Sequence, residues 1–131
     1  MPPEMRAACV RGRGEIEIAR VPMPEPGPGE VRIAVEACGI CGSDLHLFGS
    51  GFFAPGITPG HESAGRIDAL GDGVEGISSG TRVAVEPMRG CGACDSCRSG
   101  QYSICRSARL HGVHLPGGLA EYVVVPADRV H

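Results

Sequence analysis

Four of the chain's seven cysteines lie within the stretch CGACDSCRSGQYSIC, residues 91–105. They are Cys91, Cys94, Cys97 and Cys105, and the short gaps between the first three let successive thiolates turn toward one ion. Four sulfurs suit tetrahedral zinc and close its coordination shell, so the pattern predicts a structural zinc site with no position for substrate. An iron–sulfur cluster and a set of unliganded thiols are the alternatives.

The segment around these cysteines is rich in Gly, Ser and Arg and has few apolar side chains. Burial of apolar surface therefore cannot hold it together, and we expect the metal to supply its order. Structural zinc binds small domains with apparent free energies of about 10–16 kcal/mol, which is sufficient for this purpose. The sequence thus predicts a zinc-dependent lobe at about residues 88–108.

A second set of metal-ligand types is spread more widely along the chain. Cys41 lies in GICGSDLH, and His61 and Glu62 lie in ITPGHESAG. Thiolate, imidazole and carboxylate are the ligands of catalytic zinc, which keeps one coordination position open. On ligand types alone, a core cysteine and a surface histidine explain these residues at least as well.

The elements that must position these residues are mostly short strands. Apolar residues alternate with polar ones at 15–21, where Ile16 and Ile18 share a face, and at 30–37, and both patterns indicate half-buried strands. A short helix fits 43–49, with Ser43 as its N-cap. Further strands are expected at 64–70, 81–87 and 120–126. Short strands joined by Gly and Pro turns predict a mostly β, barrel-like fold.

The composition fits one soluble globular domain that spans residues 1–131. Hydrophobic residues make up 42% of the chain, charged residues 21%, and the net charge is -3, which argues against a nucleic-acid partner. No apolar run is long enough to cross a membrane and the first residues do not resemble a signal peptide, so we expect a cytoplasmic protein. In that reducing compartment we expect the cysteines to be metal ligands, catalytic thiols or small buried hydrophobic residues rather than disulfides.

Several other features are expected to carry no chemistry. Cys9 and Cys38 fit buried strand thiols, and His111 and His114 fit a solvated Gly/Pro loop better than a substrate pocket. Two glycine-rich stretches, 49–54 and 71–76, match a dinucleotide-binding pattern but neither opens a helix. We therefore expect no cofactor-binding residues of that type in this chain.

The stretch GHESAGRIDALGDGV fits the pattern GHExxGxxxxxGxxV and resembles the signature of the zinc-dependent medium-chain alcohol dehydrogenases. The segments EVRIAVEACGICGSDLH, GTRVAVEP, the four-cysteine stretch and GVHLPGGLAEYVVVPA follow in that family's order and spacing. The resemblance implies a GroES-like barrel with short helices. The sequence GVHLPGGLAEY is similar to the corresponding segment of the polyol and threonine dehydrogenase branch. Leu119 and Thr81 differ from the residues that are commoner there.

By this resemblance, Cys41 and His61 bind catalytic zinc, and Glu62 is either a third ligand or a nearby carboxylate. The resemblance further implies that Asp44 orients the ligating histidine and that Ser43 and His46 relay the substrate proton. The resemblance also implies that the metal acidifies an alcohol or polyol and that the zinc-bound alkoxide loses hydride to NAD or NADP. Two zinc ions per chain are expected.

In the family that the chain resembles, NAD or NADP binds a Rossmann domain, which is absent from this sequence. We therefore expect the chain alone to be inactive and the complete enzyme to be a homo-oligomer that acts on a small alcohol or polyol. The alternative is a free-standing zinc-binding module without catalysis. A GroES-type co-chaperonin would share the barrel but explains neither metal site.

Overall fold

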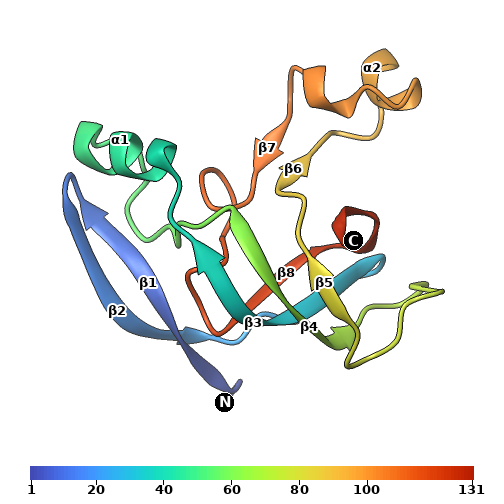
Figure 1. Cartoon of the computed structure of the whole chain (residues 1–131), viewed down its shortest axis with the longest axis horizontal. Coiled ribbons are helices and arrows are strands. Elements are labelled where there is room, and N and C mark those ends of the chain that lie inside the picture. The colour runs from blue at the N-terminus through green and yellow to red at the C-terminus, as the bar shows by residue number, and fades with distance from the viewer.

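A computed structural model describes all 131 residues. Strands dominate, and the helices are short (Figure 1). The elements are β1 (Glu4–Gly12), β2 (Glu15–Pro22), β3 (Glu30–Gly39), α1 (Gly42–Ser50), β4 (Glu62–Leu70), β5 (Arg82–Ala84), β6 (Met88–Arg89), α2 (Asp95–Arg98), the 3-10 helix η1 (Tyr102–Ile104), β7 (Arg109–Leu110), β8 (Tyr122–Pro126) and the 3-10 helix η2 (Ala127–Arg129).

The body of the molecule is an incompletely closed barrel of antiparallel strands. Its main sheet has the order β5-β4-β3-β8, and the β1–β2 hairpin joins it through a bridge between Ala7 and Ala120. A second bridge, between Val85 and Val130, brings the end of the chain against the segment that follows β5. The four-cysteine lobe projects from this body on the two-stranded β6–β7 ladder (Figure 1).

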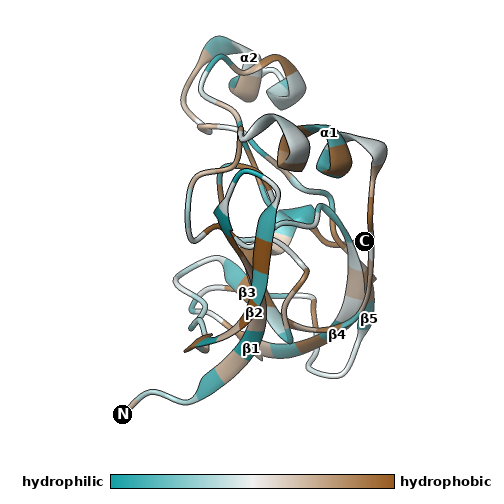
Figure 2. Cartoon of the chain, turned by 90° about the vertical axis from the view of Figure 1, so that its left-hand side faces the viewer, coloured by the Kyte–Doolittle hydropathy of each residue, from teal (hydrophilic) through white to brown (hydrophobic).

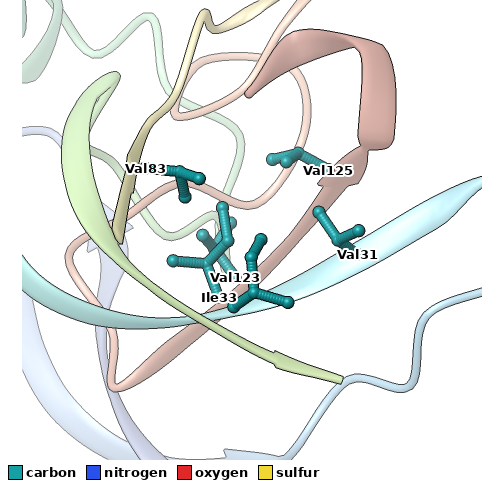
Figure 3. Packing of buried hydrophobic residues seen from close by; sticks show 6 residues of the cluster. Val31, Ile33, Val83, Val123 and Val125 are labelled. Atoms are coloured by element: carbon teal, nitrogen blue, oxygen red, sulfur yellow. The ribbon is translucent and has the colours of Figure 1, made fainter. Parts of the chain in front are cut away.

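The main core lies inside this sheet and is made of β-branched side chains. Val31 and Ile33 of β3 are fully buried, and they pack with Val123 and Val125 of β8 and with Val83 of β5 (Figure 3). The period-two alternation predicted for 30–37 therefore describes β3 correctly. Isoleucine and valine suit such a pleated, buried surface because their branched side chains are already stiff at χ1.

Two expectations about local structure are wrong. Ile16 and Ile18 lie on a strand, but their side chains are 46% and 71% exposed, because β2 is an outer strand with no layer covering that face. Figure 2 shows this hairpin at the surface of the molecule. Helix α1 has Cys41 as its N-cap, not Ser43, so Ser43 lies within its first turn. Strand β1 is not predicted by a period-two pattern, since a run of buried residues at 7–10 forms its centre.

The predicted burial of the histidines and strand cysteines is confirmed for some residues and wrong for others. Cys9 is buried on β1 as expected, whereas Cys38 on β3 is only partly buried. His114 is exposed, but His111 is only 5% exposed, so the prediction of a solvated loop is wrong for His111. The 111–118 loop folds inward because Gly112 and Gly117 pack against the backbone around Gly60. None of the helices is long and apolar enough to cross a membrane.

Candidate metal centres

The four cysteines of the lobe converge on one point. The Sγ atoms of Cys91, Cys94, Cys97 and Cys105 all lie within 4.8 Å of one another. Tetrahedral zinc with Zn–S bonds of about 2.3 Å requires sulfurs roughly 3.8 Å apart, and the Sγ atoms of Cys91 and Cys97 are 4.0 Å apart. The donor set and its spacing therefore fit a closed four-sulfur zinc site.

Backbone amides of the lobe are directed at the sulfurs. The amides of Ala93 and Cys94 donate to Sγ of Cys91 at 3.4 and 3.3 Å, and the Cys97 amide donates to Sγ of Cys94 at 3.5 Å. The bonds from Ala93 and Cys94 are the main reason that the pKa of Cys91 is lowered to about 6. Thiolate is the form that ligates zinc, so the amides of Ala93 and Cys94 favour the metal-binding form of Cys91.

The second group of donors comes from two separate segments of the chain. Cys41 follows β3 at the start of α1, while His61 and Glu62 stand at the start of β4. The antiparallel register pairs Gly39 with Glu62, which brings the end of β3 beside the beginning of β4. As a result, one donor atom from each of Cys41, His61 and Glu62 lies within 4.8 Å of the others.

The carboxylate of Asp44 contacts two residues of this donor group. Its Oδ2 accepts the Cys41 amide at 2.9 Å, and its Oδ1 lies 3.4 Å from Nδ1 of His61. Both Oδ1 of Asp44 and Nδ1 of His61 are buried and have no other partner. A proton on Nδ1 of His61 that faces this carboxylate leaves a free lone pair on Nε2. Such a contact between the ring N–H and a carboxylate is the usual way in which a metal-ligating histidine is oriented. The residues present therefore fit a metal ion with three protein ligands.

Gly60 fixes the direction in which His61 leaves the loop. Its φ is +100°, and a Cβ atom there would lie 2.6 Å from Sγ of Cys38 and 2.9 Å from the amide nitrogen of Leu119. Any other residue at this position would have a strained backbone, and its Cβ atom would clash with both neighbours. The glycine before His61 is thus required by the local packing at the site.

The remaining predicted residues lie around this group at different distances. Oγ of Ser43 is 3.5 Å from Nε2 of His61, so Ser43 borders the donor group. His46 is exposed one turn further along α1. Cys38 is near but is not one of the converging donors, and burial is the main cause that raises its thiol pKa.

Sequence reasoning missed the role of Gly39. A Cβ atom there would lie 2.7 Å from Oε2 of Glu62, so the absence of a side chain makes room for that carboxylate. The cross-strand register of β3 and β4 reveals this relation, and residue types alone carry no signal for it.

Comparison with known proteins agrees with this arrangement. Residues 27–131 match the family model described as the alcohol dehydrogenase GroES-like domain. L-threonine 3-dehydrogenase from Pyrococcus horikoshii is 45% identical over 119 residues, which cover 87% of this chain and 34% of that protein. Sorbitol dehydrogenase from Bacillus subtilis is 38% identical over an alignment of 136 residues, which covers 99% of this chain and 38% of that protein.

Among solved structures, a protein from Sinorhizobium meliloti, named as a zinc-binding dehydrogenase and solved with NADP, has a TM-score of 0.90 and 40% identity. That match covers 98% of this chain and 38% of the other. The chain therefore spans little more than a third of the length of these relatives. The GroES-like fold and the family expectation are confirmed: the chain belongs to the zinc-containing medium-chain alcohol dehydrogenases, in the threonine and sorbitol dehydrogenase branch, and corresponds to their GroES-like domain.

Proposed function

We propose that residues 1–131 are the zinc-binding catalytic portion of an NAD(P)-dependent dehydrogenase that oxidises an alcohol or polyol or reduces the corresponding carbonyl. The observation that carries the proposal is the convergence of Cys41, His61 and Glu62 with a buried Asp44 behind the histidine. A purely structural zinc site has no use for an open coordination position, so this group favours chemistry over scaffolding.

In this proposal Cys41, His61 and Glu62 hold the catalytic zinc. Zinc in such a site acts as a Lewis acid and lowers the pKa of a bound water or alcohol toward neutrality. Asp44 keeps the proton of His61 on Nδ1, so that Nε2 faces the metal, and its second oxygen fixes the Cys41 amide. Because Asp44 is only 6% exposed, water does not compete for these contacts.

The chain also supplies groups that can remove a proton from the substrate. Ser43, whose hydroxyl borders the donor group at 3.5 Å from Nε2 of His61, takes the first position of the relay. His46 lies one turn along the same helix and faces solvent, so it can pass the proton to bulk water. An imidazole is suited to this step because its pKa lies near neutrality.

Hydride transfer needs a nicotinamide cofactor, and neither of the glycine-rich stretches at 49–54 and 71–76 opens a helix that could hold its phosphates. The structure from Sinorhizobium meliloti holds NADP, and this chain matches 38% of that protein. We therefore assign the zinc chemistry to this portion and the cofactor site to a Rossmann domain of the complete enzyme.

Metal analysis of the purified chain tests the proposal. We expect two zinc ions per chain, and Cys41→Ser should lose one while the fold, measured by circular dichroism, is retained. Cobalt in the open site should change its visible spectrum when imidazole or a small alcohol is added, whereas cobalt in the lobe should not. If Cys41→Ser keeps both metals, the ligand assignment is wrong. If the visible spectrum of cobalt at the intact open site does not change with any added ligand, the site is closed. A non-catalytic zinc-binding module would then explain the site better.

A further inference from the structure

The four-cysteine lobe touches the body of the molecule at few places. Backbone hydrogen bonds of the two-residue β6–β7 ladder form its base, and Arg89 makes an ion pair with Glu30 of β3 at 3.3 Å. The remaining polar contacts of the lobe with the body are made by Tyr102, which lies in η1 between the ligands Cys97 and Cys105. A single side chain near the sulfurs thus carries much of the connection.

Tyr102 is fixed on both sides. Its hydroxyl donates to Oε1 of Glu86 at 2.5 Å, and the guanidinium of Arg129 lies 3.7 Å from the centre of its ring. The Tyr102 side chain also packs against the backbone of Gly90, where a Cβ would lie 2.9 Å from its Cβ and 2.7 Å from Sγ of Cys97. Displacement of the tyrosine would therefore disturb the region of a zinc ligand directly.

Glu86 connects Tyr102 to the last residues of the chain. Its Oε2 lies 3.3 Å from Nε2 of His131 and 4.0 Å from Nη1 of Arg129. The backbone follows the same path, because the Glu86 amide donates to the Arg129 carbonyl at 2.8 Å and the Ala84 amide donates to the His131 carbonyl at 2.8 Å. Each oxygen of the Glu86 carboxylate is thus occupied, one by the lobe and the other by residues 127–131.

We propose that Tyr102, Glu86 and Arg129, here called the clamp, are positioning residues that couple metal binding in the lobe to the seating of residues 127–131 against β5. The inference rests on the proposed function in one respect, which is that the lobe binds zinc. The lobe has few apolar side chains of its own, so without metal it loses order and Tyr102 leaves the clamp. The contacts of the clamp then form only when metal is bound, and they add to the affinity of the lobe for metal.

Linkage makes the coupling reciprocal. Whatever strengthens the clamp raises metal affinity, and metal binding protects residues 127–131 by the same factor. Arg129 is suited to this role because its side chain is only 15% exposed and lies over the tyrosine ring, so it remains fixed only while Tyr102 is in place.

The test measures zinc affinity of the lobe by competition with a chromophoric chelator, in a Cys41→Ser background so that only lobe zinc is counted. Tyr102→Phe removes the hydroxyl but keeps the ring, and Glu86→Gln keeps the shape but removes the charge. We expect each variant to bind zinc about fivefold to tenfold more weakly, and the double variant to be little weaker than either single one. Amide hydrogen exchange at 127–131 should become faster when zinc is removed from the parent protein.

Glu121→Gln is the matched control, because Glu121 is also a carboxylate bonded to an arginine, Arg6, but lies outside the clamp. Its lobe affinity should equal that of the parent. Cobalt bound to the lobe should keep a four-sulfur spectrum in every variant, which separates positioning from loss of a ligand. Unchanged affinity in Tyr102→Phe and Glu86→Gln, or an equal loss in Glu121→Gln, would overturn the inference. A parent protein without lobe zinc would instead overturn the zinc assignment on which it rests.

Discussion

The two candidate metal centres differ in what builds them. The lobe takes all its sulfur donors from one short loop with little apolar support, whereas the open site takes Cys41 from the start of α1 and His61 and Glu62 from the start of β4, which the β3–β4 register brings together. In the first region the metal has to organise the chain. In the second the chain organises the ligands before any metal binds. Under the proposed function, the same ion would be a folding element in one place and a reagent in the other.

The largest expected effect tests the lobe side of this comparison. Cys105→Ser removes the buried ligand of the lobe, and much of the roughly 10–16 kcal/mol typical of structural zinc binding would be lost. We expect trypsin to cut rapidly after Arg98 and Arg106, with one zinc per chain remaining. Cleavage followed by mass spectrometry measures this.

Cys41→Ser is the control for that experiment, because it should lose the other zinc yet leave Arg98 and Arg106 protected. Equal protection of both arginines in Cys105→Ser and the parent would contradict the comparison, since the lobe would then be folded without its metal.

A smaller effect is expected from Asp44→Asn at the open site. The amide can still accept the Cys41 N–H through its oxygen, but its NH2 group then faces Nδ1 of His61 and favours a proton on Nε2. The lone pair needed for metal is lost, and we expect the affinity of this site to fall by about 10–100-fold while lobe affinity is unchanged. Competition titration separates the two sites, and equal losses at both would show that they are not independent.

The sequence predicts these two regions with unequal success for a physical reason. The convergence of the four cysteines in the lobe could be predicted, because residues that are close in the chain need no tertiary structure to meet. The position of β3 and its buried face could also be predicted, since Val31 and Ile33 alternate with polar residues. The exposure of Ile18, the burial of His111 and the space that Gly39 leaves for Glu62 all depend on which strands become neighbours, and residue types alone do not determine this.

Substitution of one glycine in each region compares how much a side chain at that backbone position destabilises the protein. Gly60 and Gly92 both have positive φ, but a Cβ at Gly60 meets Cys38 and Leu119 whereas one at Gly92 meets nothing within 4 Å. We expect Gly60→Ala to lower the free energy of unfolding by about 1–3 kcal/mol and to weaken metal binding at the open site. Gly92→Ala should produce only a local effect in the lobe. Urea unfolding monitored by circular dichroism measures the difference, and a larger loss for Gly92→Ala would contradict it.

The smallest effect concerns His111, which lies in the loop that connects the lobe to the packing around Gly60. Its Nδ1 is 3.1 Å from the Pro116 carbonyl, but its Nε2 is buried without a partner. An unpaired buried nitrogen is unfavourable, so His111→Leu should raise the free energy of unfolding at pH 7 by about 1 kcal/mol. His114→Gln, at an exposed position, should change it little.

The same histidine predicts a pH dependence. Burial lowers the pKa of His111 in the folded chain, so below the unfolded pKa of about 6.5 the unfolded state binds a proton that the folded state does not. Its contribution to stability is therefore present above that pH and lost as the pH falls. His111→Leu should lose less stability between pH 7 and 5.5 than the parent does, as measured by urea midpoints. A steeper loss in the variant would contradict this account, since the buried imidazole would then be stabilised, and not destabilised, by protonation.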